Sequence, residues 1–454
     1  MCGLNVCING SLEEVQMMQN ATQRRGTKNF IHQIGNVIVS FDWLAITDSS
    51  AKPFFKVGNW TVFLNGYISN YKELAKKYNF DLKTNCDTEV LANMFDSFGV
   101  VKLNELNGFF SIFAIYNEFG FTPNYYCFTD RYAIKQLYQY KKHETIYISS
   151  EVKGILALEH NFKLDKKAVE DWKYSLGVMT ENTIYKGIER VRCLPFHKPR
   201  KVKICYTKAK IKLHQLWLKS IQRNKVNDLN DCVFLSGGID SGIIAKYMKP
   251  DYSFSVDYLD SKFSEIENIK LNSQGTHMTL ICNKELAEKS AFETMKALDD
   301  LKAGSCYTNF ALTEMASHFA TVIYSGAGGD EVFGGYSHRN NKDIEDVINR
   351  SEMASNKYFN ISHDEYNWKF LKAVLVVEDR MAGWHTMETR YPLLDNDFVD
   401  FALSLPDEYL EDKRILKDVS GLHFEVLNAK KKGFSNPHFT NKEWVKFTLK
   451  HIKK

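Results

Sequence analysis

The stretch Val233–Ser241 constrains the fold of this chain more than any other. Its residues are Val-Phe-Leu-Ser-Gly-Gly-Ile-Asp-Ser, and apolar residues then recur at helical spacing as far as Met248. A short apolar run that ends at glycines and is followed by such spacing predicts a buried parallel strand, a tight loop and a helix. We therefore expect an α/β sheet around this stretch.

The loop of this stretch has the properties of a phosphate-binding site. The N–H groups of Ser236, Gly237 and Gly238 stand at the start of the expected helix, where free donors and the helix dipole favour an anion. Asp240 stands where a Walker A loop carries its lysine, so this loop is of a different kind. An acid beside phosphates implies Mg²⁺ between them. The alternative is an ordinary strand-to-helix turn.

The segment Ser-Gly-Gly-x-Asp-Ser resembles the pyrophosphate loop of the ATP pyrophosphatases, which attack the α-phosphate of ATP and release pyrophosphate. That resemblance implies ATP as a cofactor and Asp240 as a ligand of Mg²⁺. It also implies ATP contacts from the end of the strand and from the loop, namely Leu235, Ser236, Gly237, Gly238, Asp240 and Ser241.

The composition limits the number of domains, the partners and the compartment that can be expected. The chain has 454 residues, of which 44% are hydrophobic, so two or three domains with sizeable cores are expected. Its 59 basic and 55 acidic residues nearly balance, so no nucleic-acid partner is expected. Nine cysteines at irregular spacing argue against a disulfide framework and a structural zinc site. With no signal sequence and no long apolar run, we expect a cytoplasmic protein without a membrane partner.

Residues 1–200 are expected to form an α+β domain. Short strands are predicted at 36–41, 60–64, 109–116, 125–129 and 145–149, and helices at 71–78 and 88–98. The segment 194–200 has two prolines and several charges, as linkers do. A domain boundary is therefore expected near residue 200.

Residues 206–454 are expected to form an α/β domain. Strands are predicted at 232–235, 252–258, 276–281 and 321–324, each followed by a segment of helical length, and the chain after residue 340 is mainly helical. This alternation predicts a doubly wound parallel sheet, whose ligands bind at the carboxyl ends of the strands.

Cys2 is a candidate nucleophile. It follows the initiator Met, and removal of that residue would leave a thiol and a free α-amine on one residue. An α-amine has a pKa near 8, so it can act as the base for its own nucleophile. Cysteine at this position is weak evidence by itself, and the residues downstream strengthen it.

The chain resembles, in order along its first half, the class II glutamine amidotransferase domain. The segments that carry the resemblance are Met1–Gly3, Arg25–Gly26, Asn65–Leu74, Cys86–Leu91, Leu106–Phe110, Asp130–Arg131 and Ser150–Lys153. Since the resemblance continues into the second half, the whole chain is similar to the glutamine-hydrolysing asparagine synthetases. The resemblance implies an N-terminal-nucleophile-hydrolase αββα sandwich before the α/β domain.

That resemblance assigns roles to residues of the first domain. Cys2 would be the glutaminase nucleophile, the Asn65 side chain and the Gly66 N–H would form the oxyanion hole, and Asp87 would hold the glutamine amino group. Asn-Gly is also the strongest hairpin-turn signal, so a turn at this position is the alternative or an additional feature.

The first domain departs from the family pattern at the expected glutamine carboxylate site. The family has arginine where this chain has Trp43, and an indole cannot make the bidentate salt bridge of a guanidinium. Tyr67 replaces a family glutamate, and Thr27-Lys28 replaces Pro-Asp. We expect a weakened or retuned glutaminase, with Lys28 or Arg25 as candidates for binding the carboxylate.

The second domain has a second glycine-rich signature at residues 325–336, Ser-Gly-Ala-Gly-Gly-Asp-Glu-Val-Phe-Gly-Gly-Tyr. On the resemblance, Ser325 and Gly326 would contact ATP together with Val256 at another strand end. Asp330 would be the second metal ligand, because two carboxylates usually hold Mg²⁺ on phosphates. Asp330 and Arg390 would lie on the acceptor side, and Lys431 would be the catalytic lysine that neutralises the phosphates.

Ala327 is the departure that most affects the substrate. The family has glutamate or aspartate here, near the acceptor carboxylate, and a methyl group cannot replace a carboxylate. Either Glu331 or Asp379 substitutes for it, or the acceptor is not free aspartate.

The resemblance therefore implies an amidotransferase with ATP and Mg²⁺ as cofactors and glutamine and aspartate as substrates. Glutamine is hydrolysed, a carboxylate is adenylated, and ammonia that has crossed an internal passage displaces AMP. The alternatives are an amide-forming ligase for another carboxylate and a non-catalytic homologue. A homodimer is one expected assembly.

Overall fold

The computed structural model describes residues 2–48, 50–159, 161–175, 183–226, 228–258, 262, 264–299, 306–335, 363–429 and 437–451. These residues form two compact units. The first takes its residues from Met1–Ala168, Thr180–Phe196 and Gly383–Thr386, and the second from Val169–Met179, His197–Ala382 and Met387–Lys454. Each unit is described by itself.

The first unit contains two antiparallel sheets. The six-stranded sheet has the order β10-β8-β9-β1-β3-β2 and the four-stranded sheet the order β4-β5-β6-β7. The strands are β1 (Gly3–Ile8), β2 (Lys28–Ile34), β3 (Val37–Trp43), β4 (Phe54–Val57), β5 (Trp60–Ile68), β6 (Gly108–Tyr116), β7 (Asn124–Thr129), β8 (Tyr138–Lys142), β9 (Thr145–Ser149) and β10 (Ile188–Arg190).

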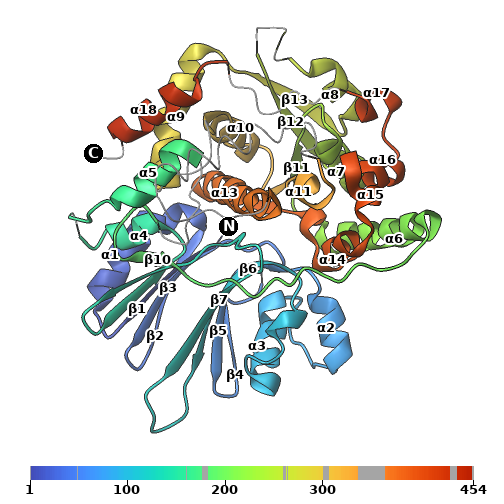
Figure 1. Ribbon diagram of the computed structural model, residues 1–454. Helices are drawn as coiled ribbons and strands as arrows, with labels where there is room; N and C mark the ends of the chain where they lie inside the picture. Colours follow the sequence, from blue (N-terminus) through green and yellow to red (C-terminus); the bar gives the residue numbers. More distant parts are fainter. Residues whose placement is uncertain are drawn as a thin grey trace. The chain divides into compact units, whose positions relative to one another are not determined.

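Helices cover the outer faces of both sheets (Figure 1). Helices α1 (Leu12–Thr22) and α4 (Val152–Leu156) pack on the six-stranded sheet, while α3 (Asp87–Phe98) packs on β4 and β5 with α2 (Tyr71–Tyr78) beside it. Alternate residues of β1, β3, β5 and β6 point between the sheets and form a core that includes Leu4, Phe41, Phe63 and Phe113. The αββα sandwich is confirmed.

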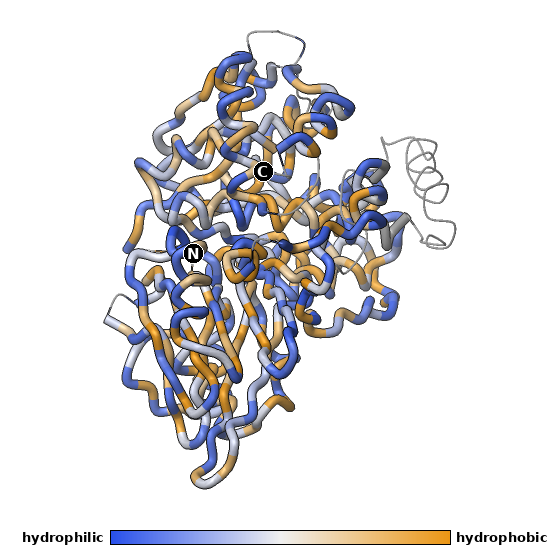
Figure 2. The backbone as a smooth tube through the Cα atoms, turned by 90° about the vertical axis from the view of Figure 1, so that its left-hand side faces the viewer, coloured by the Kyte–Doolittle hydropathy of each residue, from blue (hydrophilic) through white to orange (hydrophobic). Residues whose placement is uncertain are grey.

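The amphipathic pattern of the predicted helices explains this packing. Val90, Leu91 and Met94 of α3 are buried, as their helical spacing predicts. The helix predicted at 71–78 is α2 with the same bounds. In Figure 2 the strands of this unit carry long hydrophobic stretches, as expected for strands that lie between two layers.

The second unit contains one parallel sheet with the strand order β13-β12-β11-β14-β15. All of its neighbouring strands pair in parallel. The strands are β11 (Asp231–Phe234), β12 (Tyr252–Asp257), β13 (Thr276–Ile281), β14 (Val322–Tyr324) and β15 (Glu388–Arg390). Helix α7 (Ile239–Met248) packs on β11, and α10 (Tyr307–Ser317) packs on β12 from the other face (Figure 1).

This arrangement confirms the doubly wound sheet. The strand order reverses between β11 and β14, and ligands of such sheets bind beyond the carboxyl ends of the strands at that point. Strand β15 was not expected in the helical C-terminal part; it has only three residues, which is too short for a periodic signal.

Helices make up most of the remaining described chain. They are α5 (Lys166–Ser175), α6 (Tyr206–Asn224), α8 (Ile266–Asn272), α9 (Lys284–Leu298), α11 (Gly329–Val332), α13 (His363–Trp384), α14 (Asn396–Ser404), α15 (Asp407–Leu410), α16 (Arg414–Ser420), α17 (Phe424–Leu427) and α18 (Asn441–His451), with short 3₁₀ turns η1 (Gln23–Arg25), η2 (Leu103–Glu105), η3 (Pro392–Leu394) and η4 (Glu411–Lys413). Within the described ranges, none of the helices has the length and apolar character needed to cross a bilayer.

Candidate active sites

Cys2 lies immediately before β1, at the margin of the core between the two sheets. Its side chain is nearly buried, and its Sγ accepts a hydrogen bond from the backbone N of Leu44 over 3.4 Å. Leu44 follows β3, the neighbour of β1 in the sheet. The sheet therefore fixes the position of the thiol.

Asn65 and Gly66 lie inside β5, where they pair with Ser111 and Phe110 of β6. The hairpin turn that Asn-Gly suggested is therefore wrong. Gly66 has φ +129°, and a Cβ there would lie 2.1 Å from the carbonyl oxygen of Phe109. No other residue fits this position without moving the backbone of β6.

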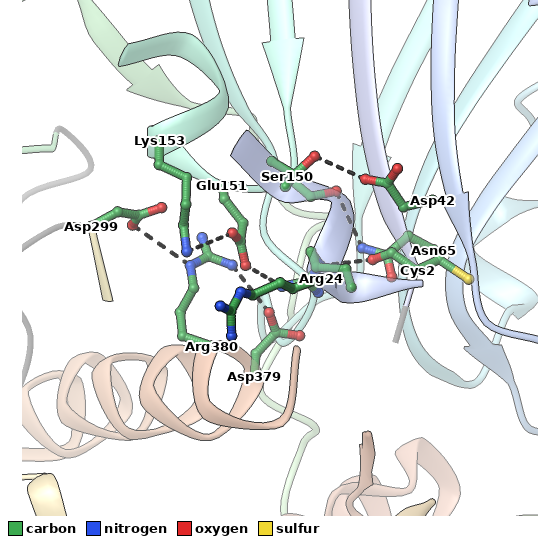
Figure 3. Close-up of polar contacts among 12 residues, drawn as sticks. Cys2, Arg24, Asp42, Asn65, Ser150, Glu151, Lys153, Asp299, Asp379 and Arg380 are labelled. Carbon is green, nitrogen blue, oxygen red and sulfur yellow. Dashed lines mark hydrogen bonds and ion pairs between the residues drawn. The ribbon is translucent and has the colours of Figure 1, made fainter. Parts of the chain in front are cut away.

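Ser150 connects the strand of the nucleophile to the strand of the predicted oxyanion hole (Figure 3). Its Oγ accepts hydrogen bonds from the backbone N of Leu4 (3.0 Å) and from Nδ2 of the buried Asn65 (3.4 Å). Its backbone N donates to the Leu4 carbonyl over 2.8 Å. The sequence placed Ser150 in a family segment but gave it no role at the site.

Arg25 holds the backbone of Cys2. Its Nε donates to the Cys2 carbonyl over 2.7 Å, and its Nη1 lies 2.7 Å from Oε1 of Glu151, which also pairs with Lys153. Arg25 is 1% exposed. Because the guanidinium is committed to these partners, Arg25 is a poor candidate for the glutamine carboxylate.

Lys28 is the cation that lies beside Trp43. The two residues pair across β2 and β3, and Lys28 Nζ lies 5.5 Å from the centroid of the Trp43 ring. A cation over an indole face is stabilised by about 0.5–1 kcal/mol at an exposed position. Of the two candidate cations, Arg25 and Lys28, it is Lys28 that lies next to Trp43, the position at which the family has arginine.

Asp87 is the first residue of α3, and both of its carboxylate oxygens accept backbone hydrogen bonds. Oδ2 accepts from the N of Ile68 over 2.9 Å, and Oδ1 from the N of Thr88 over 3.0 Å. The first contact ties the start of α3 to β5, the strand that carries Asn65 and Gly66. Asp87 is therefore brought to the predicted oxyanion strand.

In the second unit, the loop after β11 is closed by its two serines. Ser241 Oγ lies 2.9 Å from Ser236 Oγ and accepts from the Ser236 backbone N over 3.0 Å. Helix α7 then begins after Gly238, which supplies no side-chain cap. Its first N–H groups are thus directed to the loop, the arrangement that binds phosphate.

The glycine-rich loop after β14 lies directly against the loop after β11. A Cβ at Gly326 would come within 2.9 Å of the Asp240 carbonyl carbon, and one at Gly329 within 2.1 Å of Asp240 Oδ1. The glycines therefore permit a close approach that side chains would prevent. Asp330 follows on α11, so the two predicted metal ligands converge at the switch point of the sheet.

Lys413 joins the two carboxylates. Its Nζ lies 2.7 Å from Asp330 Oδ1 and also pairs with Asp240. Lys413 is 6% exposed; burial opposes its charge, but the two carboxylates outweigh that effect and raise its pKa. Lys413 was not a candidate from the sequence, because the charged run at 411–414 is typical of a solvated surface.

The backbone at Lys413 is strained. Asp412 has φ +50° and Lys413 has φ +58°, a left-handed conformation that costs non-glycine residues about 1–3 kcal/mol each. Such strain is typical of functional positions, where the surrounding structure holds a side chain in place.

The two carboxylates fit a divalent cation held together with phosphates. Within the described residues, no group of three or more His, Cys, Asp and Glu side chains is arranged to hold a metal. A pair of carboxylates that leaves further positions to phosphates and water suits Mg²⁺. The position between Asp240 and Asp330 already accommodates a cation, the ammonium of Lys413.

The other predicted residues of this site have different positions. Val256 lies near the carboxyl end of β12. The backbone N–H of Leu235, which follows β11, donates to the carbonyl of Phe254 in β12. Arg390 is buried in β15, donates to Glu388 Oε1 and to the Asn224 carbonyl over 3.0 Å each, and accepts the Ser325 N–H at its own carbonyl. Lys431 lies outside the described residues.

Comparison with known proteins matches both halves of the chain. Residues 1–205 match the model of a glutamine amidotransferase domain, and residues 212–361 and 365–452 match the model of asparagine synthase. The chain belongs to the asparagine synthase family. Membership explains why a glutamine amidotransferase sandwich and an ATP-pyrophosphatase-like sheet occur in one chain.

Relatives of this asparagine synthase family member cover most of its length. A Methanocaldococcus jannaschii protein provisionally named glutamine-hydrolysing asparagine synthetase 2 is 28% identical over 402 residues, 74% of this chain and 76% of that protein. Glutamine-hydrolysing asparagine synthetase 3 of Bacillus subtilis is 24% identical over 492 residues, 86% of this chain and 79% of the relative.

Among solved structures, the glutamine phosphoribosylpyrophosphate amidotransferase of B. subtilis is similar at 9% identity, with a TM-score of 0.33 over 80% of this chain and 95% of that one. The strand orders of its three sheets define the fold of this family member.

Proposed function

We propose that the chain is a glutamine-dependent asparagine synthetase. It hydrolyses glutamine at Cys2, activates aspartate with ATP as a β-aspartyl-adenylate, and forms asparagine when ammonia displaces AMP. The observation that carries the proposal is the convergence of Asp240 and Asp330 on Lys413 at the switch point of the parallel sheet. Family membership and the names of the relatives support the same reaction.

The glutaminase half begins when the Cys2 thiolate attacks the amide carbon of glutamine. The negative charge then develops on the former carbonyl oxygen, and Asn65 Nδ2 and the Gly66 N–H are the donors that would stabilise it. Ammonia leaves, a thioester remains, and water releases glutamate. Asp87 would bind the glutamine amino group and Lys28 its carboxylate.

The synthetase half begins when the aspartate carboxylate attacks the α-phosphorus of ATP and pyrophosphate leaves. The loop at 236–241 would bind the pyrophosphate through its N–H groups and the start of α7. Asp240 and Asp330 would hold Mg²⁺, which when bound neutralises phosphate charge. Lys413, and Lys431 by resemblance, would place positive charge beside the departing phosphates.

A different carboxylate is the second candidate acceptor, and Ala327 favours it. A methyl group stands where the family has an acid near the acceptor. If the acceptor were not aspartate, ATP would still be cleaved to AMP and pyrophosphate at the same loops.

The cell compartment and assembly are further parts of the proposal. All nine cysteines are free, which suits a reducing compartment such as the cytoplasm. A homodimer stays a prediction.

The deciding experiment is a pyrophosphate-release assay with ATP and Mg²⁺ over a panel of carboxylic acids, each with glutamine or ammonium. We expect aspartate-dependent release that Asp240→Asn abolishes. Release with another acid and not with aspartate would establish the second candidate, and release with none would contradict both.

A further inference from the structure

Glu378 brings a carboxyl group to the loop that lacks its expected acid. It lies on α13, and its Oε1 accepts a hydrogen bond from Ser325 Oγ over 3.1 Å. The same Ser325 Oγ accepts the backbone N–H of Ala327 over 3.1 Å. One hydroxyl therefore bridges Glu378 and the position where a methyl group replaces the acid.

The surroundings of Glu378 suit a proton acceptor. Its Oε2 is buried, and no ion pair of Glu378 occurs in the described part of the chain. Burial raises the pKa of Glu378 to about 7, against hydrogen bonds from Ser325 and Tyr391 and with the help of the negative charge of Glu331. A carboxyl group with such a pKa can take up and release a proton near neutral pH.

Asp379, the neighbouring acid considered from the sequence, is engaged differently. It is buried and lies 3.1 Å from Nη1 of Arg380, whose Nε lies 3.7 Å from Asp299 (Figure 3). The Arg380 guanidinium therefore engages the Asp379 carboxylate directly. Of these two neighbouring acids, Glu378 is therefore the one available for proton transfer.

We propose that Glu378 is the catalytic base of amide formation and supplies the carboxylate that is missing at Ala327. The inference rests on the proposed function. In the step, the nitrogen lone pair of ammonia forms the C–N bond to the acyl carbon, and the C–O bond to AMP breaks with its electron pair leaving on AMP. Nitrogen loses one proton, and the Glu378 carboxylate takes it.

The test separates adenylation from amide formation in the full-length protein. Aspartate-dependent exchange of labelled pyrophosphate into ATP reports the first step, and asparagine formed from ammonium reports both steps without the glutaminase. For Glu378→Gln we expect exchange within about threefold of wild type and a loss of amide formation of about 100-fold or more, the usual contribution of a general base. Glu285→Gln, an exposed position on α9, is the matched control and should change neither.

Rescue tests whether the carboxylate itself matters. Adding Ala327→Glu to Glu378→Gln places an acid on the other side of Ser325, and we expect it to recover at least about tenfold of the lost rate. If Glu378→Gln does not fold, Glu378→Asp retains the acid one methylene further back and should slow amide formation about tenfold with exchange preserved.

Three outcomes would overturn the inference. Wild-type amide formation in the folded Glu378 variants would show that no base acts there. Equal loss of exchange and amide formation would place Glu378 in adenylation instead. If the wild-type protein showed no exchange with any acid, both the proposed function and this inference would be contradicted. A defect confined to the Glu378 variants would leave the proposed function intact.

Discussion

Lys413 Nζ lies 2.7 Å from Asp330 Oδ1 and also pairs with Asp240, although these acids follow different strands of the sheet. The buried ammonium lies between two partly buried carboxylates and pairs with both at the switch point. Its strained backbone indicates that the surrounding fold fixes this position. The ammonium therefore bridges the two carboxylates, and we expect its loss to affect both stability and adenylation.

Lys413→Met should impair both stability and adenylation. Removing one partner of a buried ionic group leaves uncompensated charge and costs about 3–5 kcal/mol. We expect a lower melting temperature that Mg²⁺ and ATP partly restore, together with a loss of pyrophosphate exchange of about 100-fold, as for one lost electrostatic contact in a transition state. Lys201→Met, which breaks an exposed pair with Asp407, is the matched control. A variant as active as that control would contradict the role of Lys413.

Gly66→Ala should slow the glutaminase reaction strongly and spare ammonium-dependent synthesis. The added Cβ would meet the Phe109 carbonyl at 2.1 Å and displace the expected oxyanion donor. Loss of one such donor typically lowers the rate about 10²–10³-fold. Glutamate release and ammonium-dependent asparagine formation are measured side by side. Gly99→Ala, also at positive φ but with nothing within 4 Å of its Cβ, should leave glutamate release unchanged.

Lys28→Met should raise the KM for glutamine about tenfold with kcat nearly unchanged, because a lost contact to the substrate carboxylate weakens ground state and transition state alike. Lys163→Met removes an exposed cation elsewhere in the first unit and serves as the control. Initial rates of glutamate release give both constants. An unchanged KM would assign carboxylate binding to another group.

Asp42 should make the stability of the protein depend on pH. Burial raises its pKa to about 7, against hydrogen bonds from Thr22 and Gln19. Between its ordinary pKa of 3.8 and about 7, the folded chain binds a proton that the unfolded chain lacks, so stability falls as pH rises through this window.

Asp42→Asn removes that proton linkage. We expect the difference in melting temperature between variant and wild type to move in favour of the variant between pH 5 and pH 8. A difference that is the same at both pH values would show that Asp42 is ionised throughout.

Local features of the sequence predicted the framework well. The strand-loop-helix at 231–248 and the second glycine-rich loop follow from short apolar runs that end at glycines, a signal contained within each segment. The turn predicted at Asn65-Gly66 is wrong, because pairing of β5 with β6 overrides the turn preference of the dipeptide.

Contacts between residues far apart in the sequence could not be predicted from local patterns. Ser150 meets Asn65 from 85 residues away, and Lys413 meets Asp240 from 173 residues away. No local sequence signal distinguishes Glu378 from the adjacent Asp379. Only the packing of α13 beside the loop after β14 brings Glu378, and its hydrogen bond with Ser325, to that loop. These contacts depend on the tertiary fold, which residue spacing does not encode directly.

The most direct test of the proposed function uses the intact chain with ATP, Mg²⁺, aspartate and glutamine labelled with ¹⁵N at the amide. We expect labelled asparagine, AMP and pyrophosphate in equal amounts, all lost in Asp240→Asn, while Cys2→Ala retains synthesis only from ammonium. Formation of ADP and phosphate, or pyrophosphate release without labelled asparagine, would contradict the account.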